Sequence, residues 1–408
     1  MRSAVERTKE APFPIALIGW AALGILLHVG LARFTYGVML PALKRDLALD
    51  YFGGGALNAV HLLGYLAGTL AAPLLARRLR MARLSRFAHG LVALSAFLCA
   101  IAPDSAVMGP ALLALGRFGT GLGAGAGIVA ILVIAFAAVP AASRALVSTL
   151  VWSGMGFAVV LSGLAAGFLI EAADGWRVAF IVSALLAALL ALGFPPPDAP
   201  PADADVPSPA TAVRFGFRQV VRARWSFLFG VYFTFGAGYI AYSTFAGARL
   251  AAAGAPLPAV SAMWIVFGAA MIAGSGLAFA VLRIDRRRNF ALVAASLAGA
   301  LGSLVSWSDM TSAALAGALL VGLSVASTPT IVTAYARERC SAADYPLVFS
   351  FATAALGTGQ LLGPLVAGAL ADRLGIAAVA LFAVAVYALG AALSLLDSLT
   401  ADAGPADR

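Results

Sequence analysis

The stretch that decides the fold reads Gly116-Arg117-Phe118-Gly119-Thr120-Gly121-Leu122-Gly123-Ala124-Gly125-Ala126-Gly127. It lies inside an apolar run from about residue 106 to 139, which is long enough to cross a bilayer as one helix. Glycine at half of its positions would weaken a helix exposed to water. In lipid, small residues spaced four apart let neighbouring helices approach closely. The stretch therefore predicts a membrane helix with other helices packed around it.

The glycines of this stretch fall on two opposite faces of the expected helix. One face carries Gly119, Gly123 and Gly127, and the other carries Gly121 and Gly125. Side chains this small leave room for a neighbouring helix on each side. We expect both faces to be packing surfaces.

Arg117 stands inside the same apolar run, about 16 Å from its start at 1.5 Å per residue. Burying such a charge in a membrane helix costs on the order of 3 kcal/mol. We therefore expect Arg117 to face a wet or polar interior, where it either contacts a solute or bonds to backbone carbonyls.

The composition is that of a membrane protein. Hydrophobic residues make up 62% of the chain and charged residues 11%, against roughly 25% charged residues in soluble domains. The net charge of +9 is distributed unevenly, with 20 of the 27 lysines and arginines in alternate loops and the two termini. This asymmetry is the positive-inside pattern, which predicts cytoplasmic termini and needs no nucleic-acid partner.

Twelve apolar runs predict twelve membrane helices, and β-barrel alternation is not visible. Because the number of runs is even, both termini lie on one side. The runs are 14–42, 53–76, 87–103, 106–138, 145–171, 177–195, 224–249, 259–282, 290–307, 312–335, 347–371 and 376–396.

A polar segment divides the runs into two sets of six. It begins at Pro195-Pro196-Pro197, is rich in Pro, Ala and Asp, and ends with four arginines. This composition predicts a linker. The expected organisation is a cytoplasmic tail (1–13), an N-terminal six-helix bundle (14–195), a cytoplasmic linker (196–223), a C-terminal six-helix bundle (224–396) and a cytoplasmic tail (397–408).

The chain has few residues for cofactor or nucleotide chemistry. The two cysteines, Cys99 and Cys340, have no metal-ligand spacing, and the only lysines are Lys9 and Lys44. No phosphate-binding GxxxxGK[ST] motif occurs. We expect no cofactor, no metal, no ATP hydrolysis and a monomer whose partners are lipid and a small solute.

The two halves echo each other. Gly163-Leu-Ala-Ala-Gly167 precedes Glu171, and Pro364-Leu-Val-Ala-Gly368 precedes Asp372 at the same offset of 201 positions. Parallel six-helix repeats are one arrangement of secondary transporters.

These features together resemble the major facilitator superfamily (MFS) over essentially the whole chain. The pattern Leu113-x-x-x-Arg117-x-x-x-Gly121-x-Gly123 is similar to the fourth-helix motif of the superfamily. Three further patterns resemble its YbfB/YjiJ-like branch. They are Gly30-Leu-Ala-Arg33-Phe34-x-Tyr36, Phe235-Gly-x-Gly238-Tyr239-Ile-x-Tyr242 and Gly357-x-Gly359-Gln360-x-x-Gly363-Pro364.

One loop departs from the superfamily pattern. After the second span the superfamily normally has Gly-x-Leu-x-Asp-Arg-x-Gly-Arg-Arg, whereas this chain has Leu75-Ala76-Arg77-Arg78-Leu79-Arg80. The carboxylate expected in a gate is missing there, but Asp285 keeps an acid in the matching loop of the second half.

The resemblance implies an all-α MFS fold in which helices 1, 4, 7 and 10 line a central cavity between two pseudo-symmetric halves. It implies a secondary transporter working by alternating access, not an enzyme. The polar and aromatic residues expected at the solute site are Arg33, Tyr36, Asn58, His61, Arg117, Tyr232, Tyr239, Tyr242 and Gln360. The expected gating or packing residues are Gly119, Gly123, Gly127, Gly163, Gly167, Gly363, Pro364 and Asp285.

The charges suggest the solute class. Two arginines lie within spans, and no acid lies in the middle of one, so we expect an anionic or aromatic organic solute carried across the bacterial inner membrane. Proton coupling would have to use His61 or His28, because histidine titrates near neutral pH. A uniporter or exchanger is the alternative. His89, just after Arg86, is expected at the membrane interface.

Two other classes stay open. A transporter-like sensor or partner protein would need a soluble output domain, for which a linker of under 30 residues leaves little room. A membrane-integral enzyme would need acidic metal-binding clusters or a paired acid and base near the interface, and neither is visible.

Overall fold

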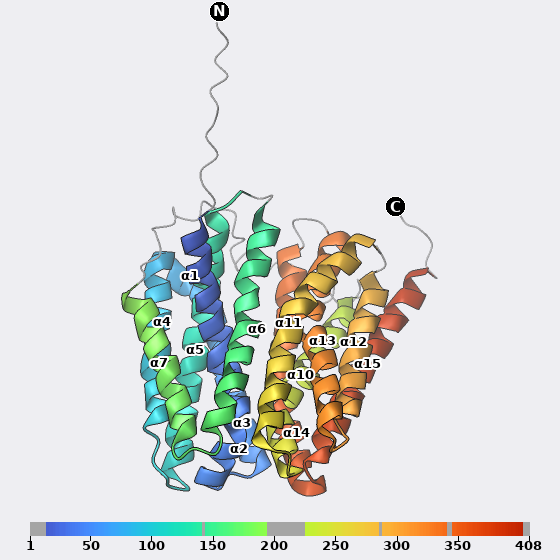
Figure 1. Ribbon diagram of the computed structural model, residues 1–408. Coiled ribbons are helices and arrows are strands. Elements are labelled where there is room, and N and C mark those ends of the chain that lie inside the picture. Colours follow the sequence, from blue (N-terminus) through green and yellow to red (C-terminus); the bar gives the residue numbers. More distant parts are fainter. Residues whose placement is uncertain (1–13, 141–142, 194–224, 285–287, 341–344, 403–408) are drawn as a thin grey trace, which may run out of the picture.

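The computed structural model describes residues 14–140, 143–193, 225–284, 288–340 and 345–402. Within these ranges the regular structure is helical and divides into two bundles (Figure 1). The expected tail 1–13, the linker 196–223 and Asp285 lie outside the described residues.

The N-terminal bundle corresponds to the first six expected spans. Its first membrane helix is continuous but contains a π-helical segment, η1, between two α-helical parts. The elements are α1 (Ile15–Ile25), η1 (Leu26–Leu31), α2 (Ala32–Leu47), α3 (Tyr51–Ala76), α4 (Met81–Ala100), α5 (Met108–Ala137), α6 (Arg144–Leu169) and α7 (Gly175–Leu192).

The described part of the C-terminal bundle contains six further long helices. They are α10 (Trp225–Ala252), α11 (Leu257–Ile284), α12 (Arg288–Val305), α13 (Thr311–Arg339), α14 (Tyr345–Leu374) and α15 (Ala377–Asp402).

The apolar exterior fits a membrane environment. In the described ranges, ten helical stretches are long and apolar enough to cross a bilayer by length and composition. Large side chains such as Phe168 (80% exposed) and Leu192 (86% exposed) lie on the outside. Because exposed aliphatic and aromatic side chains are stable in lipid and not in water, the chain is an integral membrane protein.

The glycines of α5 explain how the N-terminal bundle packs. A Cβ atom at Gly121 or Gly125 would collide with the backbone of α3. On the opposite side, a Cβ at Gly119 or Gly123 would collide with α4. The helix therefore lies between α3 and α4, in close contact with both backbones.

Among the described residues, the two bundles meet mainly where α2 packs on α10, α3 on α14 and α6 on α11. Close approaches are found at Gly37 on Ser243, Gly55 on Pro364 and Gly163 on Trp264. All three contacts lie in the half of the bundles farther from the chain N-terminus, which Figure 1 shows at the bottom.

Two local features differ from the sequence expectation. Helix α15 continues to Asp402, past residue 396, because the buried Asp397 accepts hydrogen bonds from Tyr335 and Arg339. His89 is fully buried inside the N-terminal bundle instead of facing an interface, because its ring packs against Trp20 of α1 and His28 of η1, with ring centroids 6.0 and 4.7 Å apart.

Candidate functional site

Arg117 is completely buried in α5, and its own bundle holds it in place. Its guanidinium donates to the backbone oxygen of Ala32 at 2.6 Å and to Oδ1 of Asn58 at 2.8 Å. The same group lies over the ring of Tyr36, 4.4 Å from the ring centroid. Because these partners belong to α2 and α3, Arg117 is fixed independently of the C-terminal bundle.

Asn58 continues this network into the other bundle. Its Oδ1 faces Arg117, so its Nδ2 is free to donate to Thr244 Oγ1 of α10 at 2.7 Å. Tyr36 is held within its own bundle, since its hydroxyl donates to the Gly54 carbonyl at 2.7 Å.

Arg33 lies one turn before Tyr36 but, unlike Tyr36 and Arg117, it bonds to residues of the other bundle. It is 7% exposed, and it donates to the Tyr239 hydroxyl at 2.9 Å and to Gln360 Oε1 at 3.3 Å. Gln360 Nε2 in turn donates to the Tyr239 hydroxyl at 2.5 Å. These hydrogen-bond acceptors are on α10 and α14, so Arg33 joins the two bundles. The guanidinium also lies over the ring of Tyr65 of α3, at 5.0 Å from the centroid.

His61 presents a free acceptor to this region. Thr120 donates its hydroxyl proton to the Arg117 carbonyl at 2.9 Å, so the 3.2 Å contact between Thr120 Oγ1 and His61 Nδ1 requires the proton on Nδ1. The Nε2 atom of neutral His61 is then a bare acceptor. It has no hydrogen-bond partner among the described residues.

The two guanidinium groups and His61 are close enough to interact electrostatically. Within the described part of the chain, Asp397 is the one acidic side chain that is buried, and it bonds to Tyr335 and Arg339 instead. The arginines therefore have neutral acceptors and aromatic rings as their contacts, and the site carries a positive charge. The same part of the chain contains no group of three or more metal-ligating side chains.

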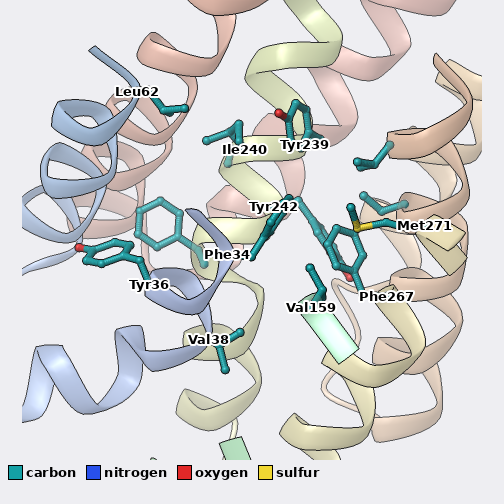
Figure 2. Close-up of a cluster of buried hydrophobic side chains, with 14 of the residues drawn as sticks. Phe34, Tyr36, Val38, Leu62, Val159, Tyr239, Ile240, Tyr242, Phe267 and Met271 are labelled. Carbon is teal, nitrogen blue, oxygen red and sulfur yellow. The ribbon is translucent and has the colours of Figure 1, made fainter. Parts of the chain in front are cut away.

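Aromatic side chains close the interface beside Arg33. Phe34 of α2 lies edge-on to Phe267 of α11, with ring centroids 6.2 Å apart, and Phe267 also contacts Tyr242 at 5.9 Å. Figure 2 shows these side chains, with Tyr239 on the neighbouring turn of α10. The cluster joins one residue of the N-terminal bundle to two of the other.

The three tyrosines of α10 have different surroundings. Tyr239 bonds to Arg33, and it stacks on Phe235, which stacks in turn on Tyr232. Tyr242 instead shares a hydrogen bond of 3.1 Å with Ser306 of its own bundle. The stacked rings of Tyr232, Phe235 and Tyr239 thus connect Tyr232 to the site.

His28 lies away from the arginines. Its ring packs against His89 with centroids 4.7 Å apart, and a Cβ at Gly127 would collide with it. These neighbours differ from those of Arg33, which bonds to Tyr239 and Gln360 of the other bundle. The structure thus separates the two histidines proposed for proton coupling, and only His61 lies near the arginines.

The remaining predicted gating residues occupy interfaces. The Gly163 carbonyl accepts a hydrogen bond from Ser261 of α11 at 2.6 Å, and Gly167 also faces Ser261. Gly363 packs on Ala237, within the C-terminal bundle, while the Pro364 carbonyl lies against Gly55 of α3.

Sequence reasoning did not select some residues that the structure places at the site. Thr120 follows Arg117 by one helical turn, a spacing that could have indicated it. Tyr65 lies four residues after His61 and seven after Asn58, a polar stripe along the expected helix that could also have indicated it. Phe34 and Thr244 lie close to selected residues in the chain, but their contacts depend on which helices pack together.

The fold is found in solved transporters of low sequence identity. The nucleoside transporter NupG aligns with a TM-score of 0.74 at 15% identity, covering 93% of this chain and 98% of that chain. A bacterial homolog of the human lysosomal transporter Spinster, in an inward-facing and occupied conformation, aligns with a TM-score of 0.72 at 16% identity, covering 96% and 98%. A D-xylose-proton symporter aligns with a TM-score of 0.72 at 16% identity, covering 94% and 96%.

Among curated proteins, none matches this chain. The family described as "Uncharacterised MFS-type transporter YbfB" matches residues 25–396. That match confirms the resemblance drawn from the motifs of the first, fourth, seventh and eleventh helices, and it identifies a transporter, not an enzyme. The chain belongs to the YbfB-type family of major facilitator superfamily transporters.

Proposed function

We propose that this transporter carries a small organic anion with an aromatic or apolar body across the bacterial inner membrane by alternating access. The observation that supports this most is the bonding of Arg33 and Arg117, two buried cations with neutral oxygen acceptors. An anionic oxygen is a stronger acceptor for a guanidinium than a hydroxyl or an amide. A carboxylate or similar group could therefore replace Tyr239 and Gln360 as the acceptors of Arg33.

Such a replacement would connect binding to movement. The Arg33 bonds to Tyr239 and Gln360 hold the two bundles together. A solute anion that takes over Arg33 removes these bonds and so favours separation of the bundles around it. The aromatic residues Phe34, Tyr65 and Phe267 supply a surface for an apolar body.

The positive-inside pattern supports an orientation with both termini in the cytoplasm. In that orientation the interface between the bundles is closed toward the outer face of the membrane. Solute would exchange with the cytoplasm in this conformation and with the outside after the α3–α14 and α6–α11 contacts open.

The test is thermal unfolding of the purified protein in detergent with a panel of small anions, cations and neutral solutes. A solute at 100 times its dissociation constant stabilises the protein by about 2.7 kcal/mol. We expect stabilisation by one anionic class, lost in Arg33→Gln and kept in Arg373→Gln, an exposed arginine near the end of α14. Stabilisation by cations or neutral solutes, unchanged in Arg33→Gln, would contradict the anion proposal.

We propose His61 as the group through which protons could be coupled to transport. The supporting observation is its unpartnered Nε2 beside the arginines, in contrast to His28, which packs against His89. Flux in proteoliposomes should then depend on pH, and the dependence should disappear in His61→Gln but persist in His28→Gln. A flux that does not vary with pH would favour a uniporter or exchanger.

A further inference from the structure

A carboxylate of the C-terminal bundle completes a helix of the N-terminal bundle. Asp372, near the end of α14, accepts hydrogen bonds from the backbone N–H groups of Tyr51 and Phe52, the first two residues of α3, at 2.8 and 2.7 Å. The contact lies at the end of the molecule opposite the chain N-terminus, where α3 and α14 meet.

The chemistry of the α3 start explains why Asp372 fits there. The first N–H groups of a helix have no partner within it. Asp50, the N-cap residue, accepts from Gly53 N at 2.6 Å, and the Asp50 carbonyl accepts from Gly54 N. Tyr51 and Phe52 are the two donors left, and Asp372 takes both. Its negative charge is also favourable at the positive end of the helix dipole.

The equivalent position of the other half lacks such a contact. Glu171, two residues after the end of α6, is the counterpart of Asp372 in the sequence echo, and it is exposed with no hydrogen bond to the described residues. The helix it would meet is α11, which begins at Leu257 between Pro256 and Pro258. Because proline has no N–H, the first two residues of this helix, Leu257 and Pro258, cannot offer the pair of donors that Tyr51 and Phe52 offer in α3.

We propose that Asp372 is a gating residue, which stabilises the conformation closed at this end of the molecule. It acts at the α3–α14 contact, and among the described residues the related α6–α11 contact has no equivalent carboxylate bond. The proposal rests on the alternating-access function, since opening of this end must separate α14 from α3. The bond must then break, and Asp372, Tyr51 and Phe52 become hydrated. The carboxylate is already exposed to solvent, so its removal should shift the balance of conformations without unfolding the protein.

The experiment measures how often the interface opens, using the full chain in detergent without solute. A reporter cysteine replaces Ser261, which lies at the α6–α11 contact and bonds to Gly163 of α6. The native cysteines are removed as Cys99→Ala and Cys340→Ser, and the rate of labelling with a hydrophilic maleimide is recorded. Because Ser261 is distant in sequence and belongs to α11, local fraying at Asp372 does not expose it.

We expect Asp372→Ala and Asp372→Asn to raise the labelling rate by about threefold to tenfold, because both variants lose the charge-assisted bonds at the start of α3. Glu171→Ala and Glu171→Gln, the matched control changes, should leave the rate unchanged. Equal rates for the Asp372 variants and the parent would overturn the proposal, as would an equal rise in the Glu171 variants.

Two design features distinguish opening of the interface from unfolding and from effects of solute. A second set of variants retains Cys99, which is fully buried in the N-terminal bundle, in place of the Ser261 reporter. Labelling of Cys99 would reveal unfolding, and in that case Asp372→Asn, which keeps the shape of the side chain, decides the test. Since no solute is present, the result is independent of whether the transported compound is an anion.

Discussion

The two buried arginines of the site are held in opposite ways. Arg117 bonds to Ala32 and Asn58 of its own bundle, whereas Arg33 bonds to Tyr239 and Gln360 of the other. Movement of the bundles leaves the first set of bonds in place and must break the second. On the proposed alternating-access function, Arg117 therefore belongs to the permanent framework of the site and Arg33 to the part that changes during transport.

The largest effect on stability should come from Arg117→Gln. Two bonds from a charged donor stabilise by about 1.5–3 kcal/mol each, while removal of a buried charge returns on the order of 3 kcal/mol. We expect a net loss of about 2 kcal/mol, seen as a lower unfolding temperature in detergent without solute. An unchanged unfolding temperature would place Arg117 outside the framework.

Tyr239→Phe should weaken the closed interface more than the fold. It removes the acceptor shared by Arg33 and Gln360, a loss of about 1 kcal/mol. We expect maleimide labelling of the Ser261→Cys reporter to rise by about fivefold. Tyr242→Phe is the control, since its hydroxyl bonds to Ser306 within one bundle. Similar rises in both variants would show that the Arg33 bonds do not hold the bundles together.

Thr244→Val sharpens the same point with a smaller change. Asn58 loses its acceptor in the other bundle but keeps its bond to Arg117. The expected loss is about 0.5 kcal/mol, or a rise of about twofold in the same labelling rate. Thr234→Val, which removes a bond to Val231 within α10, should have no effect on labelling. A rise as large as that of Tyr239→Phe would make Asn58 an equal contributor.

The smallest effect on stability should be that of Arg33→Gln. Its two bonds, one of them 3.3 Å long, are offset by relief of the buried charge. We expect a change in unfolding free energy within about 0.5 kcal/mol, measured in the absence of solute. A loss as large as that of Arg117→Gln would remove the distinction between the two arginines.

Much of the fold could be predicted from the sequence because hydropathy and glycine spacing report directly on membrane helices. The opposite glycine faces around Arg117 predicted neighbours on both sides, and α3 and α4 are those neighbours. The π-helical segment at His28 was not predicted, because hydropathy indicates an apolar helix but not whether one of its turns is α or π.

The site could be predicted only as a set of residue types. Arg33, Tyr239 and Gln360 each stood out as polar groups in apolar runs, yet their separations of 206 and 327 positions hide their contacts. The contact of Asp372 with α3 was equally invisible, since a sequence does not show which helix start lacks hydrogen-bond acceptors. Pairings between the bundles depend on tertiary packing, which single-residue patterns do not encode.

The π-helical segment Leu26–Leu31 divides the first membrane helix into two parts with different packing partners. The part before it, α1, packs on α5 and α6 of its own bundle, while α2 packs on α10 of the other bundle as well as on helices of its own. A wider backbone turn amounts to one additional residue in the register, so it sets the direction of Arg33 relative to His28. Deletion of a single residue within the segment would restore an even α-helix and rotate every side chain on one side of it by about 100° relative to the other. The direction of Arg33 toward the opposite bundle therefore depends on the π-helical turn that precedes it in the chain. Sequence changes in that turn could alter the solute contacts without changing any residue that touches the solute.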